Sequence, residues 1–220
     1  MKLEVTYSIE KDAQTYVDYI FNFKFFKHGR VNIQETLLEK LDIPLQSLLK
    51  SVENDQEAFC KIRSYLEQTY NSNPTIIEDS AAKLKTMWGK VGDNIIFSLE
   101  FLYKKPFPFK FATAYLTTNF IFPYNYEQKY FFVNFKYLST QLNTIKHELN
   151  HFMFYYYYPA GKDLNLEKYE LLKESLSFFS NPEQEGKPNE APLRDLYKSK
   201  IWNSLDEAVI QATKLLCFPK

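Results

Sequence analysis

The 220-residue sequence predicts an α+β fold that is predominantly helical. Aromatic and aliphatic residues recur at helical spacing over most of the first 100 residues, as in helices that bury one face. Two later segments, Phe111–Thr118 and Tyr130–Phe135, are rich in aromatic and β-branched residues and predict two strands joined by a longer loop. We therefore expect one domain, 1–220, in which a helical N-terminal lobe (1–100) packs on a second lobe (101–220) with a small antiparallel or mixed sheet.

The N-terminal lobe begins with a predicted strand. Polar and apolar residues alternate over Lys2–Tyr7, as in a strand with one buried face. Helical spacing then extends over Asp12–Phe26 and over Asn32–Val52. Pro44 should interrupt the latter segment, because proline lacks the amide hydrogen and clashes with the preceding turn. The stripes of Tyr, Phe, Leu and Ile in this lobe are expected to form core and one wall of a cleft.

Two further helices are predicted before residue 100, over Gln56–Tyr70 and over about Glu78–Trp88. The next segment, Gly89–Pro108, contains two glycines and two prolines. These residues are typical of loops and turns. Because this is the clearest change of composition in the chain, we place the boundary between the two lobes near residue 100.

The last third of the chain predicts four more helices. Each is bounded by capping residues or by proline and glycine, which end helices. The predicted helices cover about 139–158, 166–179, 193–201 and 205–216.

The composition of the chain argues against two classes of partner, nucleic acid and membranes. Lys and Arg together number 27, as do Asp and Glu, so the formal net charge is zero. Nucleic-acid binding requires many cations that neutralise phosphates, and we therefore expect no nucleic-acid partner. No segment approaches the roughly 20 apolar residues of a membrane-spanning helix, so no membrane association is expected.

The cysteines and the N-terminus bear on location. Cys60 and Cys217 lie in unrelated apolar contexts without a CxxC spacing, which predicts buried free thiols. The first residues lack the apolar core of a signal peptide. Together these features predict a cytoplasmic protein.

The segment HELNH at residues 147–151 has the form HExxH. On a helix, His147 and His151 lie on one face one turn apart, where both can bind a single Zn²⁺ through nitrogen at about 2.0–2.1 Å. Glu148 is poorly placed to bind the metal but can reach a water molecule that the metal acidifies. We expect it to act as general base when that water attacks a carbonyl group.

The residues around the motif favour a buried helix. The flanking residues are largely uncharged, and two of the three histidines of the chain belong to the motif. The opposite face is expected to pack into the core through Ile145, Leu149, Phe152 and Tyr156. The alternative is a surface helix that carries two ordinary histidines, because HExxH also occurs by chance.

A catalytic zinc usually has a third protein ligand and leaves the fourth position for water. The remaining histidine, His28, lies far upstream in an apparently exposed turn, and no third histidine follows the motif. A carboxylate on a downstream helix is therefore expected. Glu170 and Glu174 share one face of the predicted 166–179 helix, and Glu207 is a weaker candidate at the start of a helix.

The HExxH helix and the small residues that follow Glu174 resemble the gluzincin-type zinc metallopeptidases. The resemblance covers about residues 111–179 and implies a zincin-like core with a sheet beside the HExxH helix. It favours Glu174 over Glu170 as the third ligand. It also implies that the edge of one of the two predicted strands, Phe111–Thr118 or Tyr130–Phe135, binds an extended substrate through main-chain hydrogen bonds.

The resemblance further implies a side chain that stabilises the oxyanion. Since no spare histidine fits, a tyrosine is expected in this role, and the sequence does not choose among four candidates. These are Tyr155, Tyr158, Tyr169 and Tyr197.

The sequence thus predicts a zinc-dependent metallopeptidase that hydrolyses peptide bonds in a peptide or protein substrate. His147, His151 and Glu174 would hold Zn²⁺, and Glu148 would act as general base. One alternative is a catalytically inactive zincin-like or helical protein-interaction domain. Another is a cytosolic regulatory zinc protease.

Overall fold

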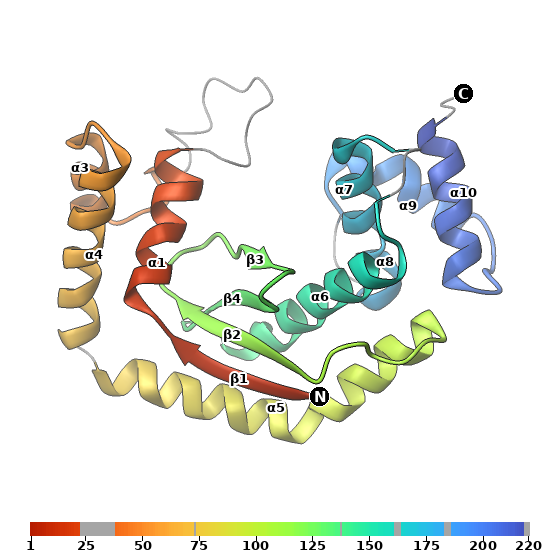
Figure 1. Cartoon of the computed structure of the whole chain (residues 1–220), viewed down its shortest axis with the longest axis horizontal. Helices are drawn as coiled ribbons and strands as arrows, with labels where there is room; N and C mark the ends of the chain where they lie inside the picture. The colour runs from red at the N-terminus through yellow and green to blue at the C-terminus, as the bar shows by residue number, and fades with distance from the viewer. Residues whose placement is uncertain (23–37, 73, 137, 161–163, 183–185, 218–220) are drawn as a thin grey trace.

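The computed structural model describes residues 1–22, 38–72, 74–136, 138–160, 164–182 and 186–217. Most of these residues are helical, and the strands form one mixed sheet of four strands. Figure 1 shows the sheet at the centre, with α5 running below it and α6 crossing beside it. The helices α1, α3 and α4 lie on one side, and α7 to α10 lie on the other. The predicted α+β, predominantly helical class is confirmed.

The sheet has the strand order β1-β2-β4-β3, with bounds Lys2–Tyr7, Phe111–Thr117, Tyr130–Asn134 and Tyr124–Asn125 in that order. β1 and β4 both pair with β2 in parallel, and β3 pairs with β4 in antiparallel orientation. The sheet is therefore mixed. Because β1 completes this sheet, the N-terminal strand belongs with residues of the second predicted lobe.

This strand order corrects one expectation about the substrate edge. Both Phe111–Thr118 and Tyr130–Phe135 form interior strands, β2 and β4, since each has a neighbour on both sides. The edge strands are β1 and the short β3. The sequence did not reveal β3 as a strand, because it is only two residues long.

The helices of the first half match the predicted segments where the structure describes them. α1 covers Ile9–Tyr16 and continues as the π-helix η1, Val17–Phe21. α3 covers Ile43–Lys50, and Pro44 occupies its first turn, where a proline costs no hydrogen bond. α4 covers Asp55–Ser72. Residues 23–37, with His28 and parts of two predicted helices, lie outside the described residues.

α5 is longer than predicted, since it covers Pro74–Tyr103 without a break. Both glycines of this region, Gly89 and Gly92, lie inside the helix rather than in a loop. Gly92 is required by packing, because a Cβ atom there would lie 2.5 Å from the Trp88 ring. The division into lobes near residue 100 stays a prediction.

The C-terminal half contains α6, Leu138–Tyr157, and α7, Leu166–Ser175. The predicted 166–179 helix is broken at Leu176, after which α8 covers Ser177–Ser180. A single 3-10 turn (η2) and two helices follow. They are η2, Pro188–Glu190; α9, Ala191–Lys198; and α10, Leu205–Cys217.

α6 is central to the core and contacts β4, α5, α7 and α8. Ile145, Leu149 and Phe152 are fully buried on it, as predicted. The prediction for Tyr156 is wrong, since 52% of this residue is exposed. It lies near the end of the helix, where its ring packs edge-on against Phe109 at the surface.

Two smaller expectations are also decided. The two cysteines form no disulfide with each other, but Cys60 is exposed on α4 rather than buried, and Cys217 is only partly buried. Among the residues that the structure describes, none of the helices combines the length and the apolarity needed to cross a bilayer.

Candidate metal centre

The first two site residues lie on consecutive turns of α6. The imidazole rings of His147 and His151 lie edge to face with ring centroids 4.2 Å apart. The helix is fixed beneath them by Tyr103 of α5, whose hydroxyl donates to the backbone oxygen of Asn150 at 3.2 Å and to its side-chain oxygen at 3.0 Å. His151 is buried, whereas His147 is partly open to solvent.

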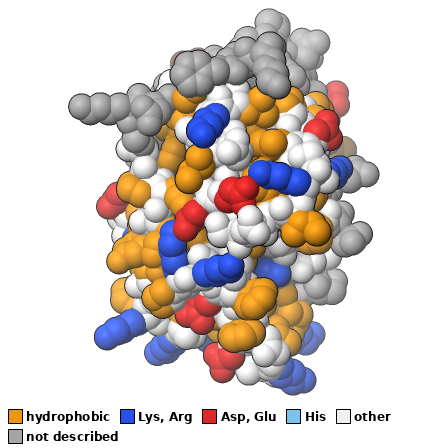
Figure 2. Space-filling view, turned by 90° about the vertical axis from the view of Figure 1, so that its right-hand side faces the viewer, with side chains coloured by type: hydrophobic (Ala, Val, Ile, Leu, Met, Phe, Trp, Pro, Cys, Tyr) orange, Lys and Arg blue, Asp and Glu red, His pale blue; other side chains and the backbone are white. Residues whose placement is uncertain are grey.

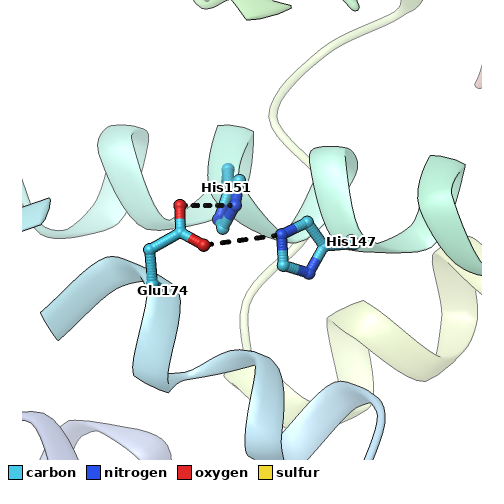
Figure 3. A group of neighbouring side chains, drawn as sticks. All are labelled: His147, His151 and Glu174. Atoms are coloured by element: carbon cyan, nitrogen blue, oxygen red, sulfur yellow. Dashed lines mark ion pairs between the residues drawn. The ribbon is translucent and has the colours of Figure 1, made fainter. Parts of the chain in front are cut away.

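Glu174 of α7 points its carboxylate at both imidazoles, as Figure 3 shows. Its Oε1 atom lies 3.4 Å from Nε2 of His151, and its Oε2 atom lies 3.9 Å from Nε2 of His147. The structure therefore brings together the three residues that the sequence suggested as ligands. The other two carboxylates are not part of this cluster, since Glu170 pairs with Lys173 and Glu207 pairs with Lys200.

The three side chains fit a tetrahedral metal ion. Zinc binds nitrogen and carboxylate oxygen at about 2.0–2.2 Å, so two ligands of a tetrahedral ion lie about 3.4 Å apart. In this site one ligand atom from each of His147, His151 and Glu174 lies within 4.8 Å of the others. Small rotations of these side chains bring the donors to the required spacing.

The charge states of the two imidazoles and of the Glu174 carboxylate favour binding of a cation. Burial lowers the pKa of His147, and burial with the neighbouring His147 and Lys173 lowers that of His151 well below its usual value, so both rings are neutral. Burial alone would raise the pKa of Glu174, but the hydrogen bond from His151 and the ammonium groups of Lys173 and Lys187 hold it well below its usual value. Two neutral imidazoles and one carboxylate are a typical zinc-binding set.

The second nitrogen of each imidazole, Nδ1, is buried and has no hydrogen-bond partner among the described residues. In most zinc sites this nitrogen donates to a carboxylate or carbonyl group, which fixes the tautomer. Among the described residues, no group accepts a hydrogen bond from Nδ1 of His147 or of His151. A metal bound at Nε2 would leave the proton on Nδ1 of each ring.

Glu148 lies at the wall of the site. Its side chain is buried, and its Oε2 atom has no hydrogen-bond partner within the described ranges. Burial raises its pKa to about 8, with Glu174 adding to the effect and Lys173 opposing it. A buried carboxyl group without a partner costs free energy, which is common at functional sites.

Lys173 is the nearest cation, and its side chain is only 2% exposed. Its ammonium group lies 3.1 Å from Glu174 Oε1 and 2.7 Å from Glu170 Oε2, and it also donates to the hydroxyl oxygen of Tyr124. Burial lowers the pKa of Lys173, but Glu174, Tyr155 and Glu170 outweigh that effect and hold it above its usual value. The lysine is therefore a buried, fully bonded cation.

The partners of Lys173 close a ring of hydrogen bonds. The hydroxyl groups of Tyr124 and Tyr155 lie 2.6 Å apart, and that of Tyr155 donates to Glu170 Oε1 at 2.8 Å. Ammonium groups only donate and carboxylates only accept, so every direction in the ring is fixed. Lys173 donates to Tyr124, Tyr124 to Tyr155, and Tyr155 to Glu170, whose other oxygen accepts from Lys173.

The hydrogen bonds of the four tyrosines that the sequence offers for stabilising the oxyanion distinguish them. Tyr155 lines the cleft at the site, whereas Tyr158 donates to Asp206, Tyr169 donates to the backbone of Tyr158, and Tyr197 lies against Ser175. Tyr124 of β3 also lines the cleft, and its ring lies 5.6 Å from that of His151. Sequence analysis missed it, since the only local signal is an aromatic residue after a proline.

The site opens into a cleft of about 1700 Å³. α6 supplies one side, and the cleft extends from Tyr19 of η1 and Tyr124 of β3 to α7 and to Lys187 at the start of η2. Among the described residues, Tyr19 is the one member of the predicted N-terminal lobe that lines the cleft, so this lobe contributes one side chain and not the predicted wall. Figure 2 shows the face of the molecule toward the C-terminal helices, where lysine, arginine, aspartate and glutamate side chains are intermixed.

Comparison with known proteins adds no family. The chain matches no family model, no curated protein and no solved structure. Any function must therefore be argued from the geometry of the site.

Proposed function

We propose that this chain is a zinc-dependent metallopeptidase of the HExxH type with a zincin-like core. One observation carries the proposal. The Nε2 atoms of His147 and His151 and the carboxylate of Glu174 converge from two helices beside a large cleft. Neutral imidazoles and a carboxylate in this arrangement leave room for a fourth, non-protein ligand.

Bound zinc would supply a Lewis acid that polarises a carbonyl group and acidifies a water molecule. The chain itself supplies the base. Glu148 is adjacent to His147 in sequence and lines the same cleft, and its Oε2 atom has no partner among the described residues. Because the charge of a bound cation would lower the pKa that burial raises to about 8, we assign Glu148 to accept the proton of the attacking water and to deliver it to the leaving amine.

The cleft suits a segment of polypeptide. Pockets for small molecules usually measure about 300–1000 Å³, and this cleft is larger, at about 1700 Å³. The sheet edge beside the site is β3, whose Tyr124 lines the cleft. An extended peptide can add to such an edge through main-chain hydrogen bonds.

Metal content tests the proposal. We expect about one zinc per chain after purification without chelator, and loss of the zinc in His147→Ala, His151→Ala and Glu174→Ala. Glu207→Gln is the matched control, since this glutamate pairs with Lys200 at 2.8 Å and should leave zinc unchanged. A chain that binds no zinc at micromolar supply would overturn the proposal.

Glu148→Gln tests the base separately. The variant should keep zinc and fold but lose hydrolysis of a peptide library, because only the proton acceptor is removed. Full hydrolysis by the zinc-loaded variant would contradict the assignment of Glu148.

A role without metal is the alternative, and one contact favours it. Lys173 already places a cation 3.1 Å from the Glu174 carboxylate, as in a buried ion pair that only stabilises the fold. In that case the chain is a protein-interaction domain without turnover. The zinc measurement separates the two functions.

A further inference from the structure

The charges around the site leave one cation unbalanced once a metal is bound. Glu170 balances Lys173 at 2.7 Å, and Glu190 balances Arg194 at 3.1 Å. Glu174 contributes one negative charge, against two positive charges on a divalent ion. Besides Glu148, whose carboxyl group is buried, the remaining charged group near the metal position is Lys187, which lies 3.5 Å from Glu174 Oε2.

The two lysines of the site differ in what they can do. Lys173 is 2% exposed and has three acceptors around its ammonium group, so it has no donor left for a ligand. The side chain of Lys187 is 67% exposed, and its pairing with Glu174 is long for a hydrogen bond. A metal bound by Glu174 would neutralise the carboxylate that Lys187 pairs with. Lys187 is therefore the cation that is able to turn toward a ligand in the cleft.

We propose that Lys187 is a specificity residue that binds a carboxylate of the substrate beside the metal position. This inference rests on the proposed function. A divalent ion and an ammonium group at one mouth of the cleft favour an anionic group over a neutral one. The carboxylate belongs either to the C-terminus of a peptide or to an acidic side chain next to the scissile bond.

The neighbouring acidic residues do not cancel this preference. Glu190 is 3% exposed and already bonded to Arg194. Glu167 also lines the cleft, but it lies in the first turn of α7, where the helix dipole stabilises its charge. Lys187 is therefore the cation that contacts the ligand beside the metal position.

A spectroscopic titration tests the inference without turnover. The full chain carrying Glu148→Gln is loaded with Co²⁺, and its visible spectrum reports binding of three probes. The probes are N-acetyl-leucyl-phenylalanine, its C-terminal amide, and the α-amide of N-acetyl-leucyl-glutamic acid. They carry a terminal carboxylate, no carboxylate and a side-chain carboxylate.

We expect at least one carboxylate probe to bind about fivefold or more tightly than the neutral amide. Adding Lys187→Gln should remove that difference, Lys187→Arg should keep most of it, and Lys61→Gln should leave it unchanged. Lys61 is a matched control because it pairs with Glu57 at 2.8 Å on α4. The probe that gains affinity identifies the source of the carboxylate.

Two failures are distinguishable. If the chain takes up neither Co²⁺ nor zinc, the proposed function is overturned and this inference falls with it. If the metal binds but no carboxylate probe binds more tightly than the amide, or Lys187→Gln keeps the preference, only the inference is overturned.

Discussion

The ammonium group of Lys173 lies 3.1 Å from Glu174 Oε1, the same oxygen that lies 3.4 Å from Nε2 of His151. One carboxylate oxygen is thus shared between a permanent cation and a candidate metal ligand. In the metal-free protein Lys173 holds the carboxylate in place. When a metal binds, the same ammonium group competes for the oxygen and repels the ion.

This relationship predicts opposite effects for Lys173→Met on metal affinity and on stability. Zinc affinity should rise by about tenfold or more, because a nearby positive charge is removed. The metal-free protein should lose about 1–3 kcal/mol of unfolding free energy, because two partly buried acidic groups lose their partner. Competition with a chromophoric chelator measures the first quantity, and urea unfolding with chelator present measures the second.

Lys168→Met is the control for this variant. Lys168 lies on the same helix, but its ammonium group donates to the backbone oxygen of Leu216 at 2.7 Å. Its removal should leave zinc affinity unchanged. If Lys173→Met weakens zinc binding, the lysine organises the site rather than competing in it.

The ring of Lys173, Tyr124, Tyr155 and Glu170 predicts strong coupling between its two hydroxyl groups. Each of Tyr124→Phe and Tyr155→Phe should cost about 1–2 kcal/mol, because each leaves part-buried donors or acceptors without a partner. The double variant should cost little more than either single variant, since the ring is already open. Urea unfolding of all four proteins completes the cycle.

Tyr130→Phe on β4 serves as the control for loss of a hydroxyl group, because its ring keeps the contacts with Tyr115 and Phe132. It should change stability by less than either ring variant. Additive costs for Tyr124→Phe and Tyr155→Phe would show that the two hydroxyl groups act independently.

The HExxH spacing placed His147 and His151 correctly because four residues make one helical turn, a purely local relation. The small residues after Glu174 identified the partner helix by resemblance. Lys173 gave no signal, although it is adjacent to Glu174 in sequence. A lysine on a helix is usually solvated, and its burial depends on how α7 packs.

Long-range contacts account for the other gaps. Tyr124 reaches the site because β3 pairs with β4, and that pairing is set by the whole sheet. The parallel pairing of β2 with both β1 and β4 likewise joins segments far apart in the chain. Composition and spacing within one segment do not specify such register.

Asp12 predicts a pH-dependent stability away from the metal site. This residue of α1 is fully buried and accepts hydrogen bonds from the side chain of Thr117, from both the backbone and the side chain of Thr118, and from the hydroxyl of Tyr70 at 2.9 Å. Burial raises its pKa, and the hydrogen bonds from these residues only partly oppose it. Folding therefore favours the protonated form.

The sign of the pH effect follows from linkage. A carboxyl group whose pKa is raised by folding contributes its full stability below the unfolded pKa of about 3.9 and loses it as the pH rises through the folded pKa. We expect Asp12→Asn to remove this loss, so the variant should gain stability relative to wild type as the pH rises from about 4. Urea unfolding across that range measures the difference.

A contradicting outcome and a second variant complete the Asp12 experiment. Parallel pH profiles for wild type and Asp12→Asn would show that Asp12 has no raised pKa. Asp12→Ala should be less stable than Asp12→Asn by about 3 kcal/mol at every pH, because several buried donors lose their acceptor. This variant separates loss of the hydrogen bonds from loss of the charge.

The two glycines inside α5 predict alanine variants of opposite sign. At Gly89 an added Cβ would meet no atom within 4 Å, and glycine in an exposed helix costs conformational entropy. Gly89→Ala should therefore stabilise the protein by about 0.5–1 kcal/mol. At Gly92 the added Cβ would lie 2.5 Å from the buried Trp88 ring, and Gly92→Ala should cost about 1–3 kcal/mol. Urea unfolding measures both, and because helix propensity is the same at the two sites, equal shifts would show that the Trp88 ring moves away without cost.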